Sequence, residues 1–374
     1  MRFTFRSFRR ALWGATVALT AIVLTGCSGE GPEITDPDAG LRNQTAMIAV
    51  EGSGGGEITH YYEVSGTIEQ AEYEAVNGQP LGVPIDAIYE RYEKLWLHSN
   101  NAGTITVLDL TTRQELGRIT GFPTGDSGGL NGMAFSNLSQ GWAIAYGSGN
   151  LFHIDARNFA LVRAIPLPGE PTAITTIDNR IFVGLETADG AGAIGLLHSN
   201  DPDLAVQIIA TLPRPPIFLG INSDKVNMPV VMPGEEGDDP ATQEIDTDLR
   251  LTMIDLQTYQ IPYQGRLFAP PLREYVGLHP NYAALTEDFF LYLATPDGVK
   301  QIDTKAWGSI SNFITGGSYS VVAADYWTDL VYAVPTATPT SVERWTKDRT
   351  ALPAITLDNP ARSIRFVSSS KVVR

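Results

Sequence analysis

A short pattern of apolar and polar positions recurs along the chain. Residues 104–112 (TITVLDLTT) begin with strand-like alternation and end in an apolar residue, an Asp and a polar turn. The same order returns three times and places the aspartates at Asp109, Asp155, Asp255 and Asp303, which are 46, 100 and 48 residues apart. The middle interval therefore holds two periods of about 50 residues, and repeats of about 40–50 residues built from short strands are typical of a β-propeller.

Strand-like runs divide most of the chain into six such repeats. They begin near Val83, Gly129, Pro168, Pro213, Pro270 and Gly316. Residues 46–78 contain most of another repeat, with strands expected at 46–50, 58–64 and 71–76, and residues 363–367 can supply the strand that it lacks. We therefore predict an all-β fold: a β-propeller of seven four-stranded blades, in which N- and C-terminal strands share one blade and so close the ring. Six or eight blades are the alternatives.

The first 27 residues follow the pattern of an export signal. Basic residues precede a mostly apolar run at 11–24, which is too short to span a bilayer. The run ends in Leu-Thr-Gly before Cys27, which resembles the lipobox of bacterial lipoproteins. The resemblance implies a signal peptide at 1–26, lipid on Cys27, a flexible tether at 27–44 and the propeller at 45–374. A membrane-anchored envelope protein follows, with the outer membrane favoured in a Gram-negative host; an ordinary secretory signal is the alternative.

Composition narrows the chemistry that this chain can perform. Cys27 is the only cysteine, so its acylation leaves no thiol for a disulfide, a thiolate metal site or a nucleophile. The formal net charge is −16, and removal of residues 1–26, with four Arg and no acid, leaves −20. This charge argues against nucleic acid and anionic lipid headgroups as partners.

The repeated aspartates have a structural interpretation. An Asp after an apolar strand accepts backbone N–H groups of the next turn. On equivalent positions of separate blades, Asp109, Asp155, Asp255 and Asp303 form a ring of single carboxylates and not a catalytic pair. In the third repeat His198 takes this position.

A long acidic insertion at 233–248 is the most distinctive local feature. Its carboxylates Glu235, Glu236, Asp238 and Asp239 are a candidate Ca²⁺ site, because Ca²⁺ takes six to eight oxygen ligands. The spacing is not that of an EF-hand. A solvated acidic loop and a partner-binding loop are the alternatives, and no cofactor is required.

Two further features are candidates for chemistry. Ser127, in GDSGG, resembles the nucleophile motifs of serine hydrolases. However, Pro123 precedes it, a Gly-rich loop follows it and no Ala-His-Cys run lies upstream, and His98 and Asp109 precede it only on blade strands, so we expect an inter-blade loop. The five histidines would form a metal site only if three or more converged on the axis. They are His60, His98, His153, His198 and His279.

The repeat also resembles the YVTN/NHL-like propellers, whose blades carry a strand ending in Val/Ile-Asp before a polar turn. The resemblance covers about residues 46–374, although the Tyr-Val-Thr-Asn run itself is absent. Such propellers include binding scaffolds, lactonase-like hydrolases and quinoprotein-type dehydrogenases, so the fold alone does not select a function. We expect a scaffold for an envelope protein or small ligand; the alternative is an enzyme with its site in the axial funnel.

Overall fold

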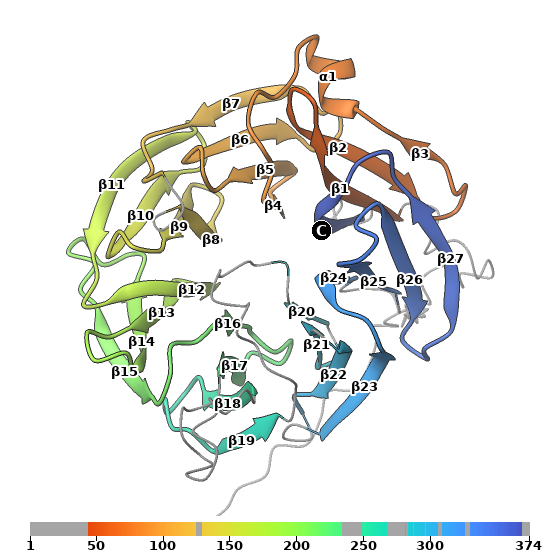
Figure 1. Cartoon of the computed structure of the whole chain (residues 1–374). Helices are drawn as coiled ribbons and strands as arrows, with labels where there is room; N and C mark the ends of the chain where they lie inside the picture. Colours follow the sequence, from red (N-terminus) through yellow and green to blue (C-terminus); the bar gives the residue numbers. More distant parts are fainter. Residues whose placement is uncertain are drawn as a thin grey trace, which may run out of the picture. The chain divides into compact units, whose positions relative to one another are not determined.

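Seven four-stranded antiparallel sheets stand around a central axis in the computed structural model (Figure 1). The structure describes residues 44–124, 129–233, 249–267, 281, 283–286, 288–295, 297–305, 309–325 and 330–368. All of them belong to one compact unit, residues 40–374. The prediction of a seven-bladed β-propeller is confirmed. Within the described residues, no helix is both long and apolar enough to cross a membrane.

Six blades are built from strands that follow one another in the chain, with the first strand of each blade next to the axis and the last on the outside. The first two are β4 (Ala87–Arg91), β5 (Lys94–Ser99), β6 (Thr104–Asp109), β7 (Glu115–Ile119) and β8 (Leu130–Asn137), β9 (Gln140–Ala145), β10 (Asn150–Asp155), β11 (Ala160–Pro166). The next two are β12 (Glu170–Ile177), β13 (Arg180–Glu186), β14 (Gly192–His198), β15 (Gln207–Leu212) and β16 (Phe218–Leu219), β17 (Asn227–Pro233), β18 (Leu249–Asp255), β19 (Tyr263–Leu267). The last two are β20 (Ala283–Leu285), β21 (Phe290–Thr295), β22 (Gly298–Asp303), β23 (Ser309–Thr315) and β24 (Tyr319–Ala324), β25 (Leu330–Pro335), β26 (Ser341–Thr346), β27 (Ala351–Thr356).

The two ends of the chain share the closing blade, as predicted. The C-terminal strand β28 (Ala361–Ser368) is innermost, followed by β1 (Gln44–Gly52), β2 (Gly55–Tyr62) and β3 (Ile68–Glu69). Strands β28 and β1 are antiparallel, with Ile364 opposite Ile48. This pairing joins the beginning of the ring to its end, so the inner strand of the closing blade is not left unpaired.

The strand predicted at 71–76 is wrong, because this segment forms the short helix α1 (Glu72–Asn77). Ala71, at φ 54°, turns the chain out of the extended conformation, and Gly78 ends the helix at φ 72°, with its N–H donating to the Glu74 carbonyl at 2.8 Å. Tyr73 is fully buried against the closing blade and the first blade. The alternation of Ala71, Tyr73 and Ala75 fits a strand equally well, so the pattern could not distinguish the two.

The hydrophobic core lies between neighbouring blades. In β6, Ile105 and Val107 belong to the cluster shared with the second blade, whereas Leu108 belongs to the cluster shared with the closing blade. The strand is therefore buried on both faces, which explains why Leu108 departs from simple alternation. Trp96 packs against Phe135 of the second blade with ring centroids 4.8 Å apart, so the aromatic side chains fill the space between blades.

Candidate functional site

The four repeated aspartates each end the third strand of a blade. Asp109 Oδ1 accepts hydrogen bonds from the N–H groups of Thr111 at 2.9 Å and Thr112 at 2.7 Å, and Asp155, Asp255 and Asp303 accept equivalent bonds from their own turns. The bond from Thr112 is the chief reason that the pKa of Asp109 lies below its ordinary value. Each carboxylate thus holds one turn of its own blade.

The histidines do not gather at one site in the described part of the chain. His60, His98, His153 and His198 lie on β2, β5, β10 and β14, in four different blades. His153 stacks on Trp142 with ring centroids 4.5 Å apart, and its burial lowers its pKa. His60 and His98 are buried and His198 is exposed, so the four side chains lie in separate environments.

Several candidate positions lie outside the described residues. They are Cys27, Ser127, Glu235, Glu236, Asp238, Asp239 and His279. Lipidation of Cys27 and Ca²⁺ binding by the acidic insertion therefore stay predictions.

Near the axis, hydrogen bonds connect blades that are distant in the sequence. The sequence did not indicate this network. Asn281 lies two residues before β20, yet its Nδ2 donates to the Asp86 carbonyl at 2.6 Å and to the Arg362 carbonyl at 2.9 Å. Its Oδ1 accepts a bond from Ser363 Oγ at 2.8 Å. Asp86 precedes β4 and Arg362 lies in β28, so one buried amide ties three blades together. Its partners are 195 and about 81 residues distant in sequence, and no local pattern could reveal them.

Charged side chains on two innermost strands form the strongest candidate site near the axis. Arg365 of β28 makes no hydrogen bond or ion pair with the described residues. Burial lowers its pKa, as does the neighbouring Arg91, while Glu90 and Tyr89 of β4 oppose the shift. Burial also raises the pKa of Tyr89, so this hydroxyl stays protonated. The group is suited to holding an anion or a carbonyl oxygen, because a guanidinium donates in a fixed planar geometry.

A second group of side chains has the composition of a metal site. Ligand atoms of His60, Glu69 and Glu72 lie within 4.8 Å of one another. However, Arg113 Nη2 lies 3.1 Å from His60 Nδ1, and Arg113 Nε lies 3.4 Å from Glu72 Oε1. The guanidinium already stands where a cation would be held. Burial, then the bond from its hydroxyl to Glu69, raises the pKa of Tyr62 to about 12.

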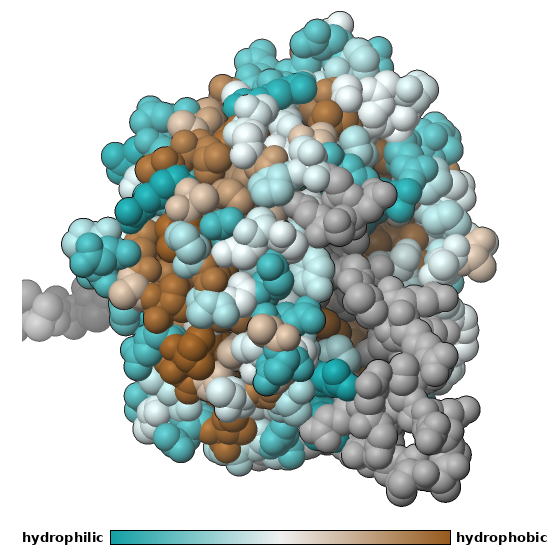
Figure 2. Space-filling model, turned by 60° about the vertical axis from the view of Figure 1, so that its left-hand side comes forward, coloured by the Kyte–Doolittle hydropathy of each residue, from teal (hydrophilic) through white to brown (hydrophobic). Residues whose placement is uncertain are grey.

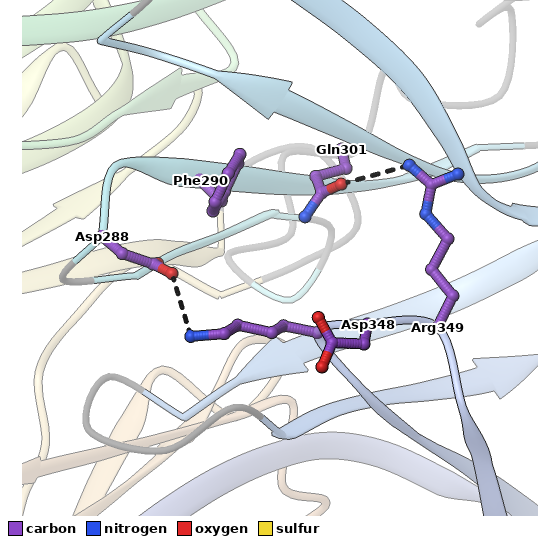
Figure 3. A pocket seen from close by; sticks show the side chains of 6 residues that line it. Asp288, Phe290, Gln301, Asp348 and Arg349 are labelled. Carbon is purple, nitrogen blue, oxygen red and sulfur yellow. Dashed lines mark hydrogen bonds and ion pairs between the residues drawn. The ribbon is translucent and has the colours of Figure 1, made fainter.

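A cavity of about 360 Å³ lies between the blade of strands β20–β23 and the blade of strands β24–β27 (Figure 3). Its walls come from the β20–β21 turn, β21, β22 and the β26–β27 turn. They consist of Asp288, Phe290, Gln301, Lys347, Asp348 and Arg349. This volume is within the range of small-molecule sites, and aromatic, amide and charged groups all face it.

Comparisons with known proteins identify the fold but no family. No family model matches the chain, and no curated protein matches it. Two proteins named putative 6-phosphogluconolactonases, from Bacteroides fragilis and Bacteroides uniformis, match with TM-scores of 0.64 and 0.63, over 89% and 87% of this chain and 100% of theirs. Both are 11% identical to it. The chain is a seven-bladed β-propeller.

A third match, the dihydro-heme d1 dehydrogenase NirN, has a TM-score of 0.55 at 14% identity and covers 84% of this chain and 64% of its own. At such low identities the likeness extends to the fold alone. The function must therefore be argued from the surfaces and side chains of this propeller.

Proposed function

We propose that the chain is an exported lipoprotein of the bacterial cell envelope whose propeller is a protein-binding module. The N-terminal segment supports the first part, because its basic residues, apolar run and Cys27 follow the lipoprotein pattern. Lipid on Cys27 would anchor the protein to a membrane surface and leave the propeller outside the bilayer. The partner would be a folded envelope protein.

The observation that carries the binding function is an apolar rim on three consecutive blades. We define the rim as Leu116 on β7, Val162 on β11 and Ile208 on β15, which are 44%, 52% and 43% exposed. All three strands are outermost in their blades, and Figure 2, in which the side of the ring with β11 and β15 comes forward, shows hydrophobic residues in several patches. Contiguous exposed apolar surface favours association with another protein, and the proposal is that these three side chains belong to one such surface.

The character of the rim favours a protein over other partners. Small-molecule sites are concave, whereas outermost strands lie on the outer circumference of the ring (Figure 1). The net charge of −16 disfavours nucleic acid and anionic membranes. Outermost strands also present backbone groups that a partner can bind by strand addition.

The competing function is that of a propeller enzyme with its site near the axis. Arg365, Glu90 and Tyr89 on innermost strands favour this alternative, as do the matches to proteins named as lactonases. An assay for lactone hydrolysis by the purified chain, with Arg365→Gln as the comparison, tests it directly. Turnover that Arg365→Gln abolishes would support the enzyme.

A matched pair of variants tests the binding function. Val162 and Val64 are 52% and 50% exposed, but only Val162 belongs to the rim. We expect Val162→Glu to abolish co-purification of an envelope protein from the producing bacterium, and Val64→Glu to leave it intact. Equal recovery with both variants would contradict a role for the rim. Fractionation of Cys27→Ser, which should release the protein from membranes, tests the anchor separately.

A further inference from the structure

We infer that the cavity between the blades β20–β23 and β24–β27 is a binding site for a neutral carbohydrate. This inference is independent of the rim, which lies on other blades. The six residues of its walls come from two blades, so the site exists only in the folded ring. Figure 3 shows Phe290 and Gln301 on one side and the β26–β27 turn with Asp348 and Arg349 on the other.

A bond network fixes one wall of the cavity. Gln301, which is buried, donates from Nε2 to Tyr292 Oη at 2.9 Å, and its Oε1 accepts from Ser311 Oγ at 3.3 Å. Arg349 Nη2 donates to the same Gln301 oxygen at 3.4 Å and to Ser311 Oγ at 2.6 Å. The guanidinium is thus held in place across the blade boundary, and a pre-positioned donor binds a ligand at lower entropic cost.

The charge of Arg349 is not neutralised by these contacts. Both of its side-chain partners are neutral oxygens, and a guanidinium carries five N–H donors, of which only those of Nη2 are used among the described residues. Donors therefore stay available beside the cavity.

Acceptors are available on the same walls. Asp348 is exposed, and its carboxylate makes no hydrogen bond or ion pair with the described residues. Asp288 Oδ1 accepts a hydrogen bond from Thr286 Oγ1, and its Oδ2 lies 3.9 Å from Lys347 Nζ in an ion pair whose side chains are both well exposed. Such an exposed ion pair is weak, so Asp288 Oδ2 can accept a hydrogen bond from a ligand.

The combination of these groups selects the class of ligand. Two carboxylates and two cations give the walls no net charge, so a phosphorylated or polycationic ligand would meet as many like charges as opposite ones. A hydroxyl group both donates and accepts, and so suits walls that offer both. The half-buried Phe290 ring adds an apolar surface for the C–H face of a sugar ring. A neutral sugar meets all three conditions.

Saturation-transfer NMR on the full-length chain in detergent measures whether sugars bind. The neutral probes are cellobiose, maltose and N,N′-diacetylchitobiose, and the charged probe is glucose 6-phosphate. We expect at least one neutral disaccharide to bind, and to bind more tightly than glucose 6-phosphate. Asp348→Ala should weaken that binding roughly tenfold, as the loss of a charge-assisted hydrogen bond does. Asp178→Ala, at another exposed carboxylate, should leave it unchanged.

Three results would overturn the inference: no transfer to any neutral disaccharide, tighter binding of glucose 6-phosphate, or equal affinity in wild type and Asp348→Ala. Asp348 is exposed and carries no core contact, so its variant should fold; equal melting temperatures would establish this. Phe290→Ala provides a second check, because it removes the stacking surface and leaves every charge in place.

Discussion

A buried ion pair between the blade β24–β27 and the closing blade should contribute strongly to the free energy of unfolding. Arg344 of β26 donates to Glu63, which follows β2, and their side chains are only 8% and 3% exposed. Arg344 also donates to Tyr332 Oη and to the Pro353 carbonyl, both at 3.0 Å, and its guanidinium lies 4.8 Å from the centroid of the Tyr61 ring. The pair therefore supports the junction at which the ring closes.

Replacement of Arg344 by Met should cost about 3–5 kcal/mol of the free energy of unfolding at neutral pH, because it leaves a buried carboxylate without its partner. Burial raises the pKa of Glu63 even in the wild type, and Arg344 only partly offsets the effect. A raised folded pKa means that the contribution of Glu63 to stability is present below its ordinary pKa of 4.5 and is lost as the pH rises through the folded value. Without Arg344, nothing offsets the burial of the charged Glu63 carboxylate, so the stability lost on ionisation of Glu63 becomes larger. The difference between wild type and Arg344→Met should therefore shrink towards pH 4.5.

Urea unfolding, followed by the fluorescence of the buried Trp96 and Trp142, measures this cost. Arg362→Met is the matched control: the ion pair of Arg362 with Glu51 is 57% and 44% exposed and is worth about 0–1 kcal/mol. The double variant Glu63→Gln/Arg344→Met should recover part of the loss. An effect of Arg344→Met no larger than that of the control, or one independent of pH, would show that the buried ion pair does not stabilise the closed ring.

The remaining predictions concern the turns, the axis and the blade connections. Asp109→Ala should destabilise the fold by about 1 kcal/mol, because the N–H groups of Thr111 and Thr112 lose their acceptor. Since the pKa of Asp109 is lowered in the folded state, its contribution to the free energy of unfolding is present above its ordinary pKa of 3.8 and is lost as the pH falls through the folded value. Urea unfolding at neutral and acid pH measures this change, with Asp109→Asn as the conservative comparison. Asn281→Ala should cost about 1–3 kcal/mol by leaving buried polar groups unpaired, and hydrogen exchange of the Ile88 amide, which donates to one of its partners, should become faster. Gly192→Ala should cost roughly 1–3 kcal/mol in a thermal melt, because its Cβ would lie 2.0 Å from the Arg214 carbonyl oxygen, and an unchanged melting temperature would contradict this close approach.

The architecture could be predicted from the sequence because its signal is local. The apolar strand, the Asp and the turn stand together at Asp109 and return at nearly constant spacing, and hydrogen bonds within each turn explain why the pattern is kept. The shared blade followed from counting strands. The helix at 72–77 was missed because Tyr73 is equally compatible with strand and helix periodicity when only one turn is present.

The candidate sites depend on contacts between distant segments, so the sequence indicated little of them. Asn281 lies 195 residues from Asp86, and nothing near either residue signals the bond. Arg349 and Gln301 are 48 residues apart, about one blade repeat, so the period places them on neighbouring blades. Only the three-dimensional structure shows that their side chains meet at a cavity.

Site-specific photocrosslinking in the living bacterium can show whether this propeller binds an envelope protein through its rim. A photoreactive residue would be placed at Val162 in one strain and at Val64, which is equally exposed but outside the rim, in another. We expect a discrete crosslinked product with an envelope protein from position 162 and none from position 64. Products of equal yield from both positions, or none from position 162 in protein that is correctly anchored, would contradict binding through the rim.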